Sequence, residues 1–319
     1  MYETCLLSCS IVISVYNEQA GIRDFYEELI RNTSADNVLY EYIFINDGST
    51  DNSLSLLSDI ASKDKRVKVI SFSRNFGHEA AMIAGIDHSK SDVIICMDSD
   101  LQHPPAMIGR MLEKYKEGFD VVNMIRMKRE DAGFMKKISS KLFYHFINKI
   151  ASIKISENAS DFFLVSKKVA DVLRTNYRER TRFLRGIIQL MGFNKTTLEY
   201  VAQKRIAGNS KYSFFKLFAL SFSAISSLSK LPLQLGIVFG MIFIFISVVL
   251  FIYSLIMWIL ETPISGYTTL IMFMSAFAGI QLFILGIIGQ YIGYVFDEIK
   301  GRPIYVIDNI IENKEDEIQ

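Results

Sequence analysis

Two long stretches without a charged side chain constrain this chain more than any other feature. Residues 231–260 contain no Asp, Glu, Lys or Arg, and neither do residues 262–296. Each stretch exceeds the roughly 20 apolar residues that an α-helix needs to cross the hydrocarbon layer of a bilayer. We therefore predict two transmembrane helices within residues 231–296, separated by Glu261 and a short loop.

Charges on either side of these stretches predict their orientation. Lys211, Lys216 and Lys230 precede the first stretch, and Lys300 and Arg302 follow the second. Cationic residues next to a span favour the cytoplasmic side of a membrane. We therefore expect a protein of the cell inner membrane, with both flanks and both termini cytoplasmic and the short loop outside.

Residues 211–230 predict a helix that lies in the membrane surface. Phenylalanines at positions 214, 215, 218 and 222 recur at three- and four-residue spacing, with Lys216 and several serines between them. Such an amphipathic segment beside an apolar span favours an interfacial helix over a core helix. Glycines at positions 279, 286, 289 and 293 would let helices approach closely, which favours a homo-oligomer.

The part of the chain before these helices has the pattern of an α/β domain. Short apolar or β-branched runs alternate with longer helix-like stretches, at residues 10–15, 40–46, 67–72, 93–97 and 120–124, with a later run at 161–165. This alternation is typical of a largely parallel sheet, whose ligands bind beyond the carboxyl ends of the strands. We therefore expect an α/β domain at 1–210, a juxtamembrane helix at 211–230, a transmembrane hairpin at 231–296 and a cytoplasmic tail at 297–319.

The run at 93–97 ends in two carboxylates, Asp98 and Asp100. Such a run indicates a strand buried on both faces, where an unpaired carboxylate is costly. Because side chains alternate along an extended backbone, we expect both carboxylates on one side where the strand emerges. A lone Asp-x-Asp is most often a pair of solvated loop residues. The alternative is a site for a divalent cation that takes its other ligands from phosphates.

Polar residues near the ends of other strands have either a structural or a ligand-binding role, and the sequence leaves the choice open. Asp47 and Gly48 are part of a turn in one interpretation. In the other, the Asp47 carboxylate accepts hydrogen bonds from a nucleotide base or ribose. His78 is expected on a helix surface. The basic segment 126–141 is either a solvated face or a pocket for an anionic group. Residues 205–212 contain a glycine and two cations, a composition suited to a loop around a pyrophosphate.

Composition narrows the possible classes of protein and its cellular compartment. The net charge of +1 provides no global field that would draw the chain to nucleic acid. Three cysteines give no disulfide framework, which indicates a reducing cytosolic setting. The first residues lack the basic region, apolar core and cleavage site of a signal peptide, so none is expected.

Five short motifs, taken together and in this order along the chain, resemble those of a known protein family. They are Ser-Val-Tyr-Asn-Glu at 14–18, Asn-Asp-Gly-Ser-Thr-Asp at 46–51, Arg-Asn-Phe-Gly at 74–77, Asp-Ser-Asp-Leu-Gln-His-Pro at 98–104 and Arg-Ile-Ala-Gly-Asn-Ser-Lys-Tyr at 205–212. This set resembles the family 2 glycosyltransferases, which implies the GT-A fold, a Rossmann-like nucleotide-diphospho-sugar transferase domain. Essentially the whole chain, spans included, is similar to polyprenyl-phosphate glycosyltransferases such as bactoprenol glucosyltransferases and dolichol-phosphate mannose synthases.

The resemblance also implies roles for particular residues. Asp161 and Asp100 would be catalytic, and Asp98 with Asp100 would hold Mg²⁺ or Mn²⁺. The residues implied to bind the donor, a nucleotide sugar, are Tyr16, Glu18, Asp47, Asp98, Ser99, Gln102, Arg205 and Lys211. Those implied to bind the acceptor phosphate are Arg126, Lys136, Lys137 and Ser140.

The implied activity is metal-dependent, inverting sugar transfer to a membrane-embedded polyprenyl phosphate, with UDP-glucose the favoured donor. It would make a lipid-linked sugar for surface glycan modification, such as that of O-antigen. Mannose, GlcNAc or another sugar is the alternative among enzymes, and a non-catalytic scaffold or a lipid-linked sugar transporter is the alternative of another class. Family members that form tetramers imply a homo-tetramer.

The role of Asp161 stays open between a base and an orienting group. A phosphate monoester has a second pKa of about 6 and is largely dianionic near pH 7, so its attack needs no strong base. This favours an orienting role. Two positions depart from the family pattern: Ser14 replaces the usual proline, which is expected to change little, and Phe163 replaces the usual arginine of bacterial relatives. The second departure leaves open how the acceptor phosphate or sugar is held near Asp161.

Overall fold

The computed structural model describes residues 6–33, 37–127, 159–179, 184–201, 231–260 and 266–313. The chain forms two compact units. The first, here called the sheet unit, contains most residues up to Lys211 together with Pro303–Gln319. The second, here called the hairpin unit, contains Tyr212–Arg302. The predicted interfacial helix at 211–230 lies outside the described residues.

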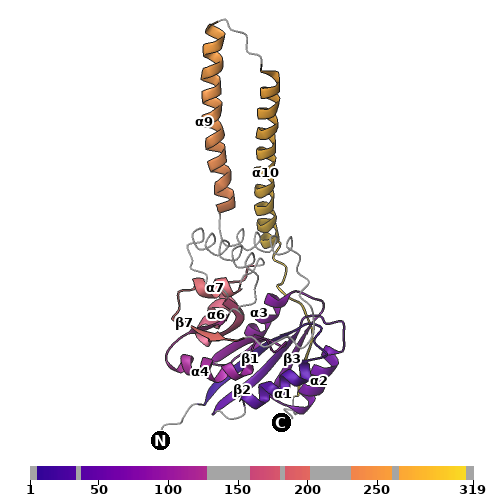
Figure 1. The fold of residues 1–319 in the computed structure, drawn as a ribbon. Coiled ribbons are helices and arrows are strands. Elements are labelled where there is room, and N and C mark those ends of the chain that lie inside the picture. Colours follow the sequence, from indigo (N-terminus) through magenta and orange to yellow (C-terminus); the bar gives the residue numbers. More distant parts are fainter. Residues whose placement is uncertain are drawn as a thin grey trace. The chain divides into compact units, whose positions relative to one another are not determined.

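The sheet unit is built on one mixed sheet of eight strands (Figure 1). In chain order the strands are β1 (Leu7–Val15), β2 (Val38–Asn46), β3 (Val67–Phe72), β4 (Val93–Asp98), β5 (Val121–Arg126), β6 (Ala159–Ser166), β7 (Lys195–Tyr200) and β8 (Ile307–Glu312). Across the sheet their order is β7-β5-β6-β4-β1-β2-β3-β8. The six strands predicted from apolar runs are confirmed, and β7 and β8 were not predicted.

Most strands of this sheet are parallel, as predicted. β1 is parallel to both β2 and β4, β2 is parallel to β3, and β5 is parallel to β7. Two strands run the other way: β6 is antiparallel to its neighbours β4 and β5, and β8 is antiparallel to β3. The start of β6 therefore lies at the edge of the sheet where the parallel strands end.

Helices cover both faces of the sheet (Figure 1). The helices on one face are α1 (Ile22–Thr33), α2 (Ser53–Lys63) and α4 (Ile108–Lys116), the last preceded by the 3₁₀ turn Pro105–Met107. Those on the other face are α3 (His78–His88), α6 (Lys167–Asn176) and α7 (Leu184–Leu190). Alternate residues of β1 serve the two cores, Ile11 and Ile13 on one face and Val12 on the other. This explains why the strands read as continuous apolar runs.

The last strand, β8, follows the hairpin unit in the chain and closes the edge of the sheet beside β3. The Tyr305 ring, just before it, stacks on Phe72 with centroids 5.2 Å apart, and its hydroxyl donates a hydrogen bond to Asp87 at 2.8 Å. No strand was predicted in the expected tail at 297–319. Since one sheet contains strands from before and after the hairpin unit, the chain between them must cross any membrane an even number of times.

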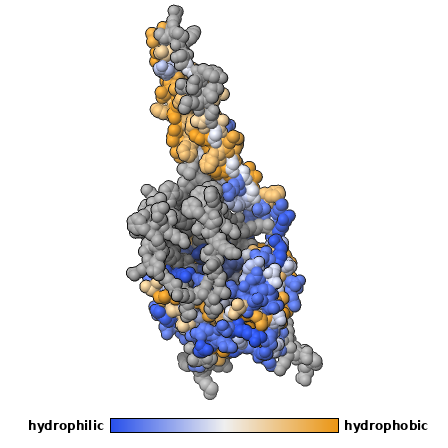
Figure 2. All heavy atoms as spheres, turned by 45° about the vertical axis from the view of Figure 1, so that its right-hand side comes forward, coloured by the Kyte–Doolittle hydropathy of each residue, from blue (hydrophilic) through white to orange (hydrophobic). Residues whose placement is uncertain are grey.

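The hairpin unit consists of α9 (Leu231–Ile259) and α10 (Tyr267–Ile299). Each contains a candidate membrane span by length and composition, Gly236–Met257 and Ala276–Ile299. Apolar side chains on both helices are exposed, Phe245 to 71% for example, and Figure 2 shows hydrophobic residues covering them. Exposed apolar surface of this extent is stable against lipid and unfavourable in water. The Phe243 and Phe277 rings, 5.6 Å apart, join the two helices.

The packing of α3 on β1 gives a first prediction. A Cβ added to Gly85 would lie 2.0 Å from Val12 Cγ1, because the helix backbone rests directly on this buried side chain. We expect Gly85→Ala to lower the free energy of unfolding by about 1–3 kcal/mol, the usual effect of overpacking. Urea denaturation of the purified chain measures this change.

Gly109 in α4 provides the matched control, since a Cβ there would meet nothing within 4 Å. Gly109→Ala should leave stability unchanged or raise it by up to about 1 kcal/mol, because alanine restricts the unfolded chain. Equal destabilisation by both substitutions would contradict the tight contact of α3 with β1.

Candidate active site

Three neighbouring strands place Ser14, Asp98 and Asp161 in one row. β1 and β4 are parallel with Ser14 beside Asp98. β4 and β6 are antiparallel with Cys96 beside Phe163, and this register, continued by two residues, sets Asp98 opposite Asp161. Residues directly opposite one another in an antiparallel pair point to the same face of the sheet. The row therefore presents a hydroxyl and two carboxylates on one face.

The row faces α3. Residues two positions away on the same strands share its face, and they belong to the core packed against α3: Val12, Cys96 and Phe163. Phe163 is 1% exposed and thus part of this core, so the position where relatives were expected to carry arginine holds no polar group. Because α3 starts at His78, the first side chain of the helix reaches the row.

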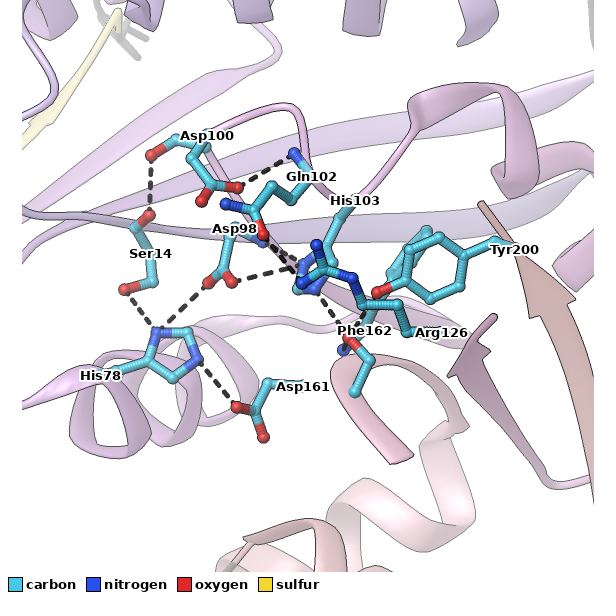
Figure 3. Close-up of polar contacts among 12 residues, drawn as sticks. Ser14, His78, Asp98, Asp100, Gln102, His103, Arg126, Asp161, Phe162 and Tyr200 are labelled. Carbon is cyan, nitrogen blue, oxygen red and sulfur yellow. Dashed lines mark hydrogen bonds and ion pairs between the residues drawn. The ribbon is translucent and has the colours of Figure 1, made fainter. Parts of the chain in front are cut away.

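His78 contacts all three members of the row (Figure 3). Its Nδ1 lies 3.1 Å from Ser14 Oγ and 3.3 Å from Asp98 Oδ1. Its Nε2 lies 3.9 Å from Asp161 Oδ2. His78 lies in the first turn of α3 and its side chain is 34% exposed, as expected for a helix-surface residue, but its ring also contacts the row. Ser14, expected to change little, supplies one of the ring's partners.

The backbone turns sharply after Asp98, where β4 ends. Leu101 adopts a φ of 59°, a left-handed conformation that is strained for a residue with a branched side chain. The Gln102 N–H donates to Asp100 Oδ1 at 3.0 Å, and Ser99 Oγ donates to the Ser14 carbonyl at 3.1 Å. Strand alternation therefore defines the direction of Asp98 alone, and Asp100 is held by this bend instead.

A buried polar network around His103 supports the bend of the backbone after Asp98. The Asp98 N–H donates to His103 Nδ1 at 2.9 Å, so the neutral ring carries its proton on Nε2, which donates to Ser160 Oγ at 2.7 Å. The Tyr200 hydroxyl donates to the same oxygen at 2.9 Å, and the Phe162 ring stacks on His103 (Figure 3). Burial lowers the pKa of His103, which favours the neutral ring. The network was not predicted, because its members come from three separate segments.

Arg126 lies at the end of β5 near the same bend. Its Nη1 donates to Gln102 Oε1 at 2.9 Å, so a residue predicted to contact the acceptor meets one predicted to contact the donor (Figure 3). The other predicted phosphate-binding residues lie outside the described residues: Lys136, Lys137, Ser140, Arg205 and Lys211. Their roles remain predictions.

The loops after β1 and β2 are joined by hydrogen bonds. Asn17, with a φ of 56°, accepts a hydrogen bond from the Thr50 N–H at 2.8 Å. The Glu18 N–H donates to Ser53 Oγ at 2.9 Å. Tyr16 is 46% exposed beside these loops. The predicted roles of Tyr16 and Glu18 in donor binding remain predictions.

Asp47 has partners within the protein. It is 2% exposed and its two oxygens accept hydrogen bonds from the Phe76 N–H at 2.7 Å and the Gly77 N–H at 3.0 Å. Of the two alternatives for this residue, the structure favours the structural one, since Asp47 fixes the segment that leads into α3. Direct contact of Asp47 with the nucleoside remains a prediction.

Asp98 and Asp100 could hold a divalent cation. Within the described ranges, no group of three or more His, Cys, Asp or Glu side chains could hold a metal ion. A cation would therefore take further ligands from phosphate and water, as Mg²⁺ does in many phosphate sites. Burial raises the pKa of Asp98, and Asp100 and Asp161 raise it further, against the opposing effect of His103 and His78. A site that disfavours its own negative charge in this way fits a cation.

Glu79, next to His78, adds a further carboxyl group. Its carboxylate accepts a hydrogen bond from the Leu184 backbone of α7. Burial and, to a lesser extent, the charge of Asp161 raise the pKa of Glu79 to about 7, against the opposing effect of Arg185. Glu79 was not singled out in the sequence, because a glutamate in the first turn of a helix is an ordinary feature.

Comparison with known proteins places the chain in a family. Residues 10–174 match Glycosyl transferase family 2. The uncharacterized glycosyltransferase YkcC of Bacillus subtilis is 39% identical over 312 residues, 96% of this chain and 95% of that protein. The SfII prophage-derived bactoprenol glucosyl transferase of Shigella flexneri is 36% identical over 306 residues, 94% of this chain and 97% of that protein.

A solved structure of glucosyl-3-phosphoglycerate synthase from Mycobacterium tuberculosis, in complex with Mn²⁺, UDP-glucose and phosphoglyceric acid, matches with a TM-score of 0.47 and 18% identity, over 70% of this chain and 78% of that one. The family match and the mixed sheet covered by helices define a GT-A glycosyltransferase. The chain belongs to glycosyl transferase family 2. The predicted fold class and enzyme class are thereby confirmed.

Asp98 gives a prediction that separates stability from activity. Because its pKa is raised in the folded protein, ionisation of Asp98 opposes folding, and stability falls as pH rises above the ordinary carboxyl pKa. We expect Asp98→Asn to raise the Tm of the metal-free protein at neutral pH and to lower sugar transfer about a hundredfold or more. Thermal denaturation in detergent with a chelator, and a transfer assay, measure the two effects.

Asp59→Asn provides the control, since Asp59 pairs with Lys63 on α2 and is 40% exposed. This variant should lower the Tm slightly or leave it unchanged, and its transfer rate should match that of the wild type. A lower Tm for Asp98→Asn than for the wild type would contradict the burial of an unfavourable charge at this position.

Glu79 predicts a pH dependence of stability. The folded protein binds its proton up to about pH 7, whereas the unfolded chain releases it near 4.5, so this residue makes stability fall as pH rises between these values. Glu79→Gln can still accept the Leu184 hydrogen bond. It should have a higher Tm than the wild type at pH 8, and the difference in Tm should be smaller at pH 5. Tm measured across this range tests the sign.

The control is Glu117→Gln, which replaces a 51% exposed side chain on the surface. Its Tm profile should follow that of the wild type. If Glu79→Gln also followed the wild-type profile at every pH, the raised pKa of Glu79 would be refuted.

Proposed function

We propose that this glycosyltransferase transfers glucose from UDP-glucose to a polyprenyl phosphate at the cytoplasmic face of a membrane. The observation that carries the proposal is the meeting of Asp98, Asp100 and Asp161 at one edge of the sheet, in a chain with two candidate spans. A bactoprenol glucosyl transferase that aligns over 94% of the chain, spans included, supports a lipid acceptor. UDP-glucose is our choice of donor within this class.

In the proposed reaction, an oxygen of the acceptor phosphate attacks the anomeric carbon of the sugar. The bond between that carbon and the donor diphosphate breaks, and its electron pair leaves with UDP. The incoming phosphate is already largely dianionic near pH 7, since its second pKa is about 6, so no side chain has to remove a proton. The site must therefore position the two reactants and supply positive charge that stabilises the leaving diphosphate.

Asp98 and Asp100 would hold Mg²⁺ or Mn²⁺, whose charge stabilises the leaving diphosphate. Arg126 would add a cation on the same side of the bend, bridged to Gln102, which would contact the donor. Tyr16 and Glu18, on the joined loops, would bind the nucleoside. Arg205 and Lys211 would complete the diphosphate site and Lys136, Lys137 and Ser140 the acceptor site.

Asp161 would orient the acceptor or the sugar. It lies opposite Asp98, which we propose to hold the metal, so the transferred sugar would sit beside it between diphosphate and acceptor. A carboxylate there can accept hydrogen bonds from sugar hydroxyls and hold the anomeric carbon toward the attacking oxygen. We therefore prefer orientation to base catalysis.

Two independent observations support the proposed membrane orientation. β8 shares a sheet with strands that precede the hairpin unit, so both connections to the hairpin lie on the same side of the membrane. Cations flank the hairpin on that side, Lys230 before it and Lys300 and Arg302 after it, which favours the cytoplasm. The active site would therefore face the compartment that contains nucleotide sugars.

The test is a transfer assay with the purified full chain in detergent. We expect label from UDP-glucose, presented with Mg²⁺ or Mn²⁺ and a short polyprenyl phosphate, to appear in a lipid product. Asp100→Asn should lower the rate about a hundredfold or more, because the leaving diphosphate loses its stabilising charge. Asp59→Asn is again the control and should transfer at the wild-type rate.

A panel of nucleotide sugars separates the alternatives. Efficient transfer from a mannose or GlcNAc donor in place of UDP-glucose would replace the proposed sugar and keep the reaction class. No transfer to the polyprenyl phosphate from any donor, with either metal, would refute the proposed function.

A further inference from the structure

We propose that His78 and Arg185 are positioning residues that hold the Asp161 carboxylate from two sides and fix its direction in the active site. The inference deepens the proposed function and rests on it. It gives a positioning role to two residues that are not among the predicted site residues: His78, which was expected on a helix surface, and Arg185.

The two oxygens of Asp161 have different partners. Oδ2 lies 3.9 Å from His78 Nε2, and Oδ1 lies 3.4 Å from Arg185 Nε. His78 starts α3 and Arg185 lies in the first turn of α7, two helices on the same face of the sheet. A carboxylate contacted on both oxygens by separate elements keeps one orientation, whereas a single contact would leave it free to rotate about its Cβ–Cγ bond.

The His78 ring is itself fixed by its other nitrogen. Nδ1 lies 3.1 Å from Ser14 Oγ and 3.3 Å from Asp98 Oδ1, and in the tautomer in which the Ser14 hydroxyl donates to Nδ1, the ring proton lies on Nε2. Nε2 is shielded from solvent and makes no hydrogen bond within the described residues. Its distance to Asp161 exceeds a hydrogen bond by about 1 Å, and a buried donor without an acceptor is costly. Asp161 is thus the acceptor toward which Nε2 is directed (Figure 3).

Arg185 is held in place through its neighbour. The backbone of Leu184 donates a hydrogen bond to Glu79, which is the second residue of α3. This bond joins the first turns of α3 and α7, the two turns that supply His78 and Arg185. The spacing of the two positioning residues is therefore fixed by the helices and does not depend on their own contact with Asp161.

Asp161 needs such support because its other close neighbours are carboxyl groups. Asp98 stands opposite Asp161 in the sheet, and the charge of Asp161 acts on the nearby carboxyl group of Glu79. Like charges repel, so an unsupported Asp161 side chain would turn away from Asp98 and out of the site. Arg185 and the His78 ring, which contacts both Asp98 and Asp161, oppose this repulsion. Held in this way, Asp161 can present its remaining lone pairs to a sugar hydroxyl in one direction.

Substitutions at His78 separate the functions of its two nitrogens. Asparagine keeps a polar atom near the position of Nδ1 but does not reach Asp161, whereas glutamine places its amide near the position of Nε2. We expect His78→Asn to lower kcat about 10- to 100-fold with little change in the KM for the nucleotide sugar, and His78→Gln to recover part of the loss. Arg185→Gln should resemble His78→Asn, and Arg185→Lys should recover part of its loss.

Two matched controls lie on the same face of the sheet. His88 ends α3, and its Nδ1 contacts the Ala84 carbonyl at 2.9 Å. Arg178 pairs with Asp87 at 2.9 Å, an arginine–aspartate contact at the far end of the same helix. His88→Asn and Arg178→Gln should keep kcat within about twofold of the wild type. A kcat within that range for His78→Asn or Arg185→Gln would overturn the proposal.

A double-mutant cycle tests the contact without sugar transfer. Arg185→Gln should lower the Tm in the wild-type background and lower it about half as much or less in an Asp161→Asn background, because the partner charge is already absent. Equal Tm shifts in the two backgrounds would overturn the proposal. If the wild type transferred no sugar, the proposed function would fail, and this cycle would still decide whether Arg185 holds Asp161.

Discussion

The direction of β6 is the constraint on which the whole candidate site depends. β6 lies antiparallel between β4 and β5, so its first residues are at the edge where the parallel strands end. This places Asp161 opposite Asp98 and turns both side chains to the same face. In a parallel arrangement the start of β6 would lie at the opposite edge, and the two carboxylates would be separated by the length of the strands.

The gathering of carboxylates works against the stability of the sheet unit. Burial and mutual repulsion raise the pKa of Asp98 and Glu79, which means that the folded protein resists their ionisation. Within the described part of the chain, the groups that oppose this effect are few: His78 contacts Asp98, and Arg185 lowers the pKa of Glu79. The electrostatics thus favour a cationic ligand, because such a ligand would remove an unfavourable interaction already present in the folded chain.

Those features that local composition determines were predictable from the sequence. Central strands are continuous apolar runs, and the two spans are long and uncharged, so neither depends on distant residues. Asp98 and Asp161 stood out because each borders such a run. The place of His78 depends on strand order and helix position, which no local pattern contains. β7 and β8 were missed because edge strands carry charged and polar residues, Lys195 and Glu199 in β7 and Asp308 and Glu312 in β8.

The position of β8 sets an order of events during biosynthesis. Strands β1 to β7 leave the ribosome first and can fold as they emerge, but β3 remains an open edge until the residues after the hairpin have been made. An open edge strand invites pairing with other chains. The final strand can close it only after both apolar helices have been synthesised. Completion of the sheet unit must therefore wait until both apolar helices have been synthesised.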